Sequence, residues 1–150
     1  MDDYAKRLSR AAESLLENET VTADLDTEAA NALLAWGQDC VERIVRDSVG
    51  LGDAAAEEAI ALRLKAMRRL MRQVNRWVAG QKAAGADLVQ PPWPKMLEQA
   101  AIIYGQDYAL PEAGQLEMFL AQNATLLSHP EQLIVSLRQY IERFNKEQST

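Results

Sequence analysis

The stretch Ile60–Val78, IALRLKAMRRLMRQVNRWV, decides the fold. Apolar residues recur in it at spacings of three and four, which is the repeat of an amphipathic α-helix. The apolar face consists of Ile60, Leu64, Met67, Met71, Val74 and Val78, flanked by Leu70 and Trp77. Asp53 is a suitable N-cap, so we predict a helix over residues 53–80, roughly 40 Å long at 1.5 Å per residue. We expect this helix to be the central element of the fold.

Helical periodicity recurs along the rest of the chain, and the period-two alternation typical of strands is nearly absent. Further helices are expected over residues 3–18, 26–48 and 95–104, and two more open at Pro111 and Pro130. Prolines suit the first turn of a helix, and Asp26 suits an N-cap. The polar segment ENETVTADLD, residues 17–26, is interpreted as a connection. The sequence therefore predicts an all-α bundle of about six helices.

A second feature is the break at residues 81–94, QKAAGADLVQPPWP. Gly85 and three prolines are incompatible with a regular helix there. We predict one helical domain over residues 1–150, in which this Pro-rich connection separates two sub-bundles. The second sub-bundle has only about 55 residues and would be marginally stable alone.

Composition limits the class of protein. The 150 residues carry a net charge of −6, which argues against a general affinity for nucleic acid or anionic membranes. Cys40 is the only cysteine, so no intramolecular disulfide can form. No apolar run reaches the ~20 residues that span a bilayer, and the start MDDYAKRLSR lacks the apolar region of a signal peptide. We therefore expect a cytoplasmic protein without membrane association.

Positive charge concentrates on the central helix. Residues 63–95 contain 8 Lys and Arg against 1 Asp, whereas the segments before and after them are acidic. Five of these basic residues lie on or beside one helical face, namely Lys65, Arg68, Arg69, Arg72 and Arg76. We call this set the basic stripe. It spans about 17 Å, a length that can meet several phosphates of one nucleic-acid strand.

Three interpretations of the basic stripe compete. It is the solvated edge of a core helix beside acidic helices, a docking face for an acidic protein, or a nucleic-acid site. Charged edges are routine on amphipathic helices, and aromatic residues for base stacking are missing from this face. The sequence favours these interpretations in the order given.

Trp93, inside PPWP, has two interpretations. It is either a plug that packs the connection onto the bundle or an exposed recognition residue, since Pro-rich segments bind aromatic grooves. A tryptophan buries a large apolar area, so the plug is the first choice. Tyr104 and Tyr108 are candidates to join it in an aromatic cluster.

Catalytic and metal-binding patterns are not evident. His129 is the only histidine and suits a helix start, and one Cys with one His cannot build a zinc site. We predict no cofactor, no metal site and no catalytic residue. The expected function is a non-enzymatic interaction or adaptor module that binds a protein partner or forms a homo-oligomer. A nucleic-acid-associated regulator is the alternative, and a small enzyme with a carboxylate/arginine site is the second alternative.

Overall fold

The structure is a computed structural model that describes residues 10, 19–48, 53–105 and 107–149. Its helices are α2 (Glu19–Thr22), α3 (Thr27–Ser48), α4 (Asp53–Ala84), α5 (Trp93–Tyr104), α6 (Ala113–Gln122) and α7 (Pro130–Ser149), with a 3₁₀ turn at Ala124–Leu126. The described residues contain no strand. The predicted all-α class is therefore confirmed.

The six predicted helices do not correspond one to one with the helices of the structure. Helices α3 to α7 match five predicted helices, whereas the one expected over residues 3–18 falls almost entirely outside the described residues. The segment interpreted as a polar connection contains the short helix α2, and Val21 in it is buried in the core. A single apolar residue among polar neighbours gives no periodic signal, which is why α2 was missed.

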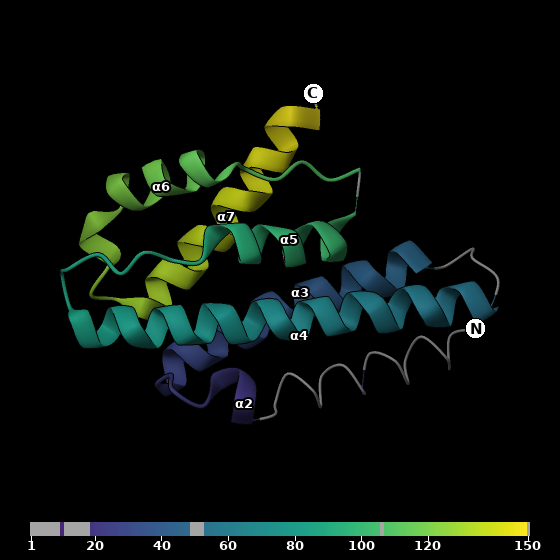
Figure 1. Ribbon diagram of the computed structural model, residues 1–150, viewed down its shortest axis with the longest axis horizontal. Coiled ribbons are helices and arrows are strands. Elements are labelled where there is room, and N and C mark those ends of the chain that lie inside the picture. The colour runs from purple at the N-terminus through teal and green to yellow at the C-terminus, as the bar shows by residue number, and fades with distance from the viewer. Residues whose placement is uncertain (1–9, 11–18, 49–52, 106, 150) are drawn as a thin grey trace.

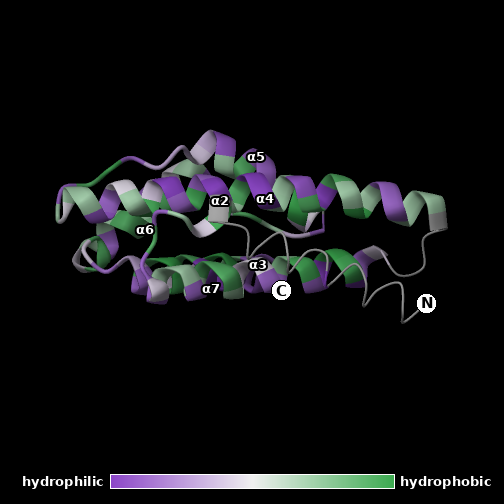
Figure 2. Ribbon diagram, turned by 90° about the horizontal axis from the view of Figure 1, so that it is seen from below, coloured by the Kyte–Doolittle hydropathy of each residue, from purple (hydrophilic) through white to green (hydrophobic). Residues whose placement is uncertain are grey.

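The long helix α4 is the central element, as predicted. Its 32 residues extend over about 48 Å, and it packs against α2, α3 and α5. Helix α7 packs in turn against α3. Figure 2 shows α4 and α5 in one layer and α3 and α7 in the other, and Figure 1 shows α3 lying along α4.

One continuous hydrophobic core joins the helices on both sides of the Pro-rich connection. Met67, Met71, Val74 and Val78 of α4 are fully buried, as their spacing predicted. In α3 Ala29 and Val41 are enclosed, whereas the neighbouring Ala30 and Val45 are only partly covered. Helix α3 lies between α4 and α7, so the side it buries is broader than a single stripe.

The connection after α4 is organised by Gln81. Helix α4 continues four residues beyond Gly80, to Ala84, and Gly85 then turns the chain at a φ of +66°. The fully buried Gln81 amide nitrogen donates to the carbonyls of Gly85 and Asp87, both at 2.9 Å, and its oxygen accepts from Val89 N at 2.8 Å. This side chain therefore supplies the hydrogen bonds that an irregular segment needs when it lies against the core.

Two polar contacts hold the start of α3 against α4. Asp26 caps α3 as predicted, since its Oδ1 accepts from Ala29 N at 2.9 Å. Its Oδ2 also receives Lys82 Nζ at 2.8 Å, and this bond, followed by the cap, lowers the pKa of Asp26. Asn75, buried within α4, donates to Asp24 at 3.5 Å.

Candidate functional site

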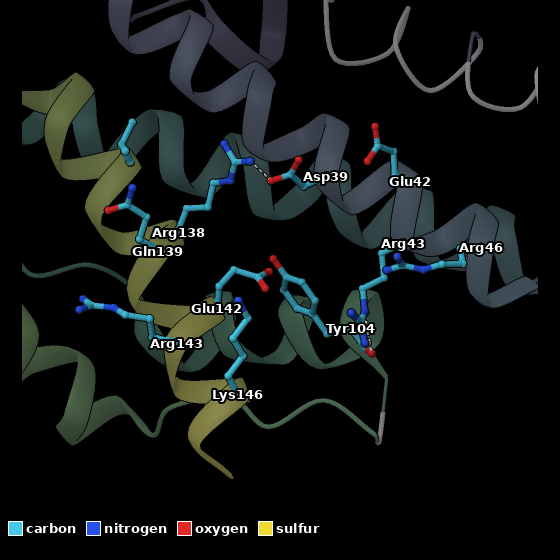
Figure 3. A pocket seen from close by; sticks show the side chains of 11 residues that line it. Asp39, Glu42, Arg43, Arg46, Tyr104, Arg138, Gln139, Glu142, Arg143 and Lys146 are labelled. Atoms are coloured by element: carbon cyan, nitrogen blue, oxygen red, sulfur yellow. Dashed lines mark hydrogen bonds and ion pairs between the residues drawn. The ribbon is translucent and has the colours of Figure 1, made fainter. Parts of the chain in front are cut away.

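An open groove lies between α3 and α7 and has a volume of about 760 Å³. Figure 3 shows side chains of α3 on one wall and side chains of α7 on the other, with Tyr104 of α5 between them. Five basic side chains line this α3–α7 groove, namely Arg43, Arg46, Arg138, Arg143 and Lys146. Three acidic ones accompany them, namely Asp39, Glu42 and Glu142. The lining therefore carries a net charge of 5 − 3 = +2.

Helical spacing produces these walls. Residues 39, 42, 43 and 46 of α3 and residues 138, 139, 142, 143 and 146 of α7 follow steps of one and three, which place them on one face of each helix. The two helices are joined across the groove by an ion pair between Asp39 and Arg138. Burial raises the pKa of the Asp39 carboxyl, and the positive charge of Arg138 works against that increase.

Tyr104 forms a rigid part of the groove lining. Its hydroxyl oxygen accepts a hydrogen bond from Trp36 Nε1 at 2.9 Å and lies 3.7 Å from Cys40 Sγ. Its ring stacks on Tyr108 with the ring centroids 4.5 Å apart, and the Arg43 guanidinium lies 4.3 Å from the Tyr108 centroid. Contacts on several sides of the ring hold Tyr104 in one position.

Burial also determines the protonation of these tyrosines. It raises the pKa of Tyr104 well above its ordinary value. The pKa of Tyr108 is raised by burial and, in addition, by the nearby Glu142 carboxylate. A phenol with a raised pKa exchanges no proton near neutral pH. The groove lining combines arginine, tyrosine and glutamate, and burial keeps the Tyr104 hydroxyl protonated near neutral pH.

Arg43 has a second, structural role at the C-terminal end of α5. Its Nε donates to Tyr104 O at 3.4 Å, and Arg63 Nε donates to Ile103 O at 2.9 Å. Asp47 lies between the two arginines, 3.8 Å from Arg43 and 3.0 Å from Arg63. These guanidinium groups satisfy carbonyls at the end of a helix, where no intrahelical donor is present.

Three basic groups at one end of the groove differ from Arg43 and Arg138. Arg46, Arg143 and Lys146 are exposed, and within the described residues none of them has an ion-pair partner. They are therefore the positive charges of this surface that remain available to a ligand.

The basic stripe predicted from the sequence lies elsewhere, on α4. Lys65, Arg69 and Arg76 are exposed, whereas Arg68 and Arg72 are half-buried. None of the five lines the α3–α7 groove. The structure therefore separates the predicted stripe from the groove, and a binding role for the stripe stays a prediction.

Trp93 is buried, with an exposed fraction of 2%, which is the arrangement that the plug interpretation requires. Its ring packs on Trp77 with the centroids 5.7 Å apart. The expected cluster of Trp93 with Tyr104 and Tyr108 is wrong, because Trp93 begins α5 and Tyr104 ends it. Eleven residues of helix separate the two rings by about 16 Å along the axis.

Other candidate chemistries find little support in the described residues. No group of three or more His, Cys, Asp and Glu side chains among them could hold a metal ion. Cys40 is buried, and this burial raises its pKa to about 12. His129 is exposed at the start of α7, and its carbonyl accepts the first backbone bond of that helix from Leu133 N at 3.0 Å.

The chain matches no protein-family model, and neither a curated protein nor a solved structure is significantly similar to it. Within the described ranges, the helices are all too short or too polar to cross a lipid bilayer. We therefore infer the function from the residues that line the groove.

Proposed function

We propose that this protein is a non-enzymatic interaction module of helical-bundle type that holds a segment of a partner polypeptide in the α3–α7 groove. The observation that carries the proposal is the lining of that groove, where exposed Arg46 lies on the α3 wall, exposed Arg143 and Lys146 lie on the α7 wall, and buried Tyr104 lies between the walls. Arginine and tyrosine are the residue types that contribute most of the binding energy at protein interfaces. The excess of positive charge favours a partner segment with carboxylates.

The mixed charge of the lining favours a polypeptide over a nucleic acid. Asp39, Glu42 and Glu142 lie among the basic groups and would repel a phosphate backbone. The net charge of −6 over the chain adds to that repulsion. A polypeptide carries charges of both signs and can place an amide or ammonium group beside each carboxylate.

The alternative function is nucleic-acid-associated regulation through the basic stripe of α4. Exposed Lys65, Arg69 and Arg76 support it, because one helical face presents them together. A cytoplasmic location is part of the proposal in either case. A reducing compartment suits a chain whose lone cysteine is buried and whose core needs no disulfide.

Fluorescence anisotropy with two labelled probes tests the proposal. One probe is a 16-residue peptide of alternating Glu and Ala, and the other is a single-stranded DNA of 16 nucleotides. The groove variant combines Arg143→Glu with Lys146→Glu. The matched control combines Lys65→Glu with Arg69→Glu, which also exchanges two exposed basic groups for acids.

We expect the peptide to bind the unaltered protein and to lose at least tenfold in affinity with the groove variant, while the α4 variant binds it as before. Circular dichroism must show both variants folded. If the protein binds DNA but not the peptide, and the α4 variant abolishes that binding, the nucleic-acid alternative replaces the proposal.

A further inference from the structure

The α3–α7 groove continues beyond the basic lining into a second hollow with the opposite charge. This second hollow has a volume of about 490 Å³ and lies between the first turns of α3 and α7. Its charged lining consists of Glu28 and Glu131, and among the described residues no basic side chain lines it. Val135 lines both hollows, so the two adjoin at this residue.

Charge is therefore graded along the groove. Helices α3 and α7 run in the same direction, because the residues that face each other across the groove increase in number together along both helices. Glu28 and Glu131 mark the end where both helices begin. The paired Asp39 and Arg138 occupy the middle, and Arg143 and Lys146 lie toward the end where the helices finish. Glu42 and Glu142 lie among the basic groups of that last end, so the groove has an acidic end, a neutralised centre and an end with a net excess of basic groups.

We infer that the groove binds an amphipathic helix of a partner protein, acidic in its N-terminal half and basic in its C-terminal half, lying antiparallel to α3 and α7. This inference rests on the proposed function and identifies the kind of segment that is bound. In this orientation the acidic half lies against Arg46, Arg143 and Lys146, and the basic half lies against Glu28 and Glu131.

The helix dipoles favour the same orientation. The C-terminal ends of α3 and α7 carry partial negative charge, and an antiparallel helix places its positive N-terminal end beside them. Acidic residues in the first turns of a helix and basic residues in the last turns also stabilise that helix itself. The charge order that suits the groove is therefore the order that suits the bound helix.

The dimensions agree with a helix of ordinary length. Glu28 and Arg46 are 18 residues apart on α3, which corresponds to about 27 Å. A partner helix of about 18 residues spans that distance, whereas an extended segment would need only about eight. Val135, with an exposed fraction of 39%, lies where the two hollows meet and offers an apolar contact at the centre.

A second copy of this chain fits the groove less well. Two copies related by a twofold axis would bring acidic ends to basic ends, but they would also set one concave face against another. Such an arrangement leaves a gap along the centre and buries little apolar surface. A separate convex helix fills the groove.

Two labelled 18-residue helical peptides of identical composition test the inference. One has Glu in its first half and Lys in its second, and the other has the reverse order. Each carries Leu at the central positions and a side-chain lactam bridge, so that both are equally helical. Anisotropy titrations measure their binding to the full chain and to a reversed-groove variant with Glu28→Lys, Glu131→Lys, Arg143→Glu and Lys146→Glu.

We expect the acid-first peptide to bind the unaltered protein at least tenfold more tightly than the lysine-first peptide. The reversed-groove variant should invert this preference, which separates groove polarity from any difference between the peptides themselves. Equal binding of both peptides overturns the inference, as does a preference that the variant leaves unchanged. If neither helical peptide binds while the Glu/Ala peptide does, the proposed function stands and the inference fails. If nothing binds, both fail.

Discussion

Replacement of Trp93 by alanine tests how the Pro-rich connection is anchored. Trp93 is buried at the first residue of α5 and packs on Trp77 at an interplanar angle of 58°. Truncation of a buried tryptophan costs about 3–5 kcal/mol, because the lost apolar contacts are accompanied by a cavity. In a chain of this length each kcal/mol lowers the melting temperature by about 2–4 °C. We therefore expect Trp93→Ala to lower it by roughly 6–20 °C.

Phenylalanine substitutions separate packing from hydrogen bonding in the same pair. Trp77 Nε1 donates to Val89 O at 2.9 Å, whereas Trp93 Nε1 makes no hydrogen bond among the described residues. Trp77→Phe and Trp93→Phe remove the same atoms, but only the first leaves a carbonyl of the connection without its donor. Trp77→Phe should therefore cost about 1 kcal/mol more than Trp93→Phe.

Urea denaturation followed by circular dichroism measures all three free energies of unfolding. Leu88→Ala is the matched control, because Leu88 lies in the same connection with an exposed fraction of 51% and should change stability by no more than about 0.5 kcal/mol. If Trp93→Ala costs as little as Leu88→Ala, Trp93 does not anchor the connection. The interpretation of Trp93 as a recognition residue would then replace the plug.

Two further predictions concern buried polar groups. Gln81→Leu removes the side chain that hydrogen-bonds to Gly85, Asp87 and Val89, and should lower the free energy of unfolding by about 2–4 kcal/mol. In hydrogen exchange the Val89 amide should lose most of its protection. Unchanged protection would contradict the role of Gln81. Burial raises the pKa of Tyr104 and Tyr108 above the ordinary value near 10, so their contribution to stability is complete below pH 10 and is lost as pH rises above it. Absorbance at 295 nm at pH 11 should therefore report fewer tyrosinates in the folded protein than in the denatured one, and equal numbers would refute the burial argument.

The main features of the fold could be predicted from local patterns. Apolar spacing located α4 and its buried face, and Asp26 and Pro130 located the starts of α3 and α7, whereas α6 begins at Ala113, two residues after the predicted Pro111. Local patterns were less informative at the helix ends. Helix α4 continues past Gly80 because Gln81 and Trp77 bond to the following segment and hold it against the core. Those bonds depend on the path of the segment after the helix, and the periodicity of the helix carries no information about that path.

Pairings between distant segments were the least predictable feature. The acid-first spacing of Asp39 and Arg43 suggests a local pair at i and i+4. In the structure Asp39 instead forms an ion pair with Arg138, 99 residues further on. Arg43 forms an ion pair with Asp47 and lies over the rings of Tyr104 and Tyr108. A side chain at a helix–helix junction meets groups from two elements, and the spacing within one helix shows only one of them.

The candidate site illustrates the same limit. In the sequence the basic residues of α4 stand out, because they lie on consecutive turns of one helix and are therefore close together along the chain. The basic end of the α3–α7 groove draws Arg46 from one helix and Arg143 and Lys146 from another, about a hundred residues apart, within segments that are acidic on average. Net segment charge conceals such a site, since it averages these basic groups with every carboxylate of the segment. Parallel packing of α3 and α7 is what sorts the charges, because it aligns the first turns of both helices at one end and the last turns at the other. The graded groove is therefore a property of the helix packing, and reversal of four of its charges tests that packing and the proposed partner together.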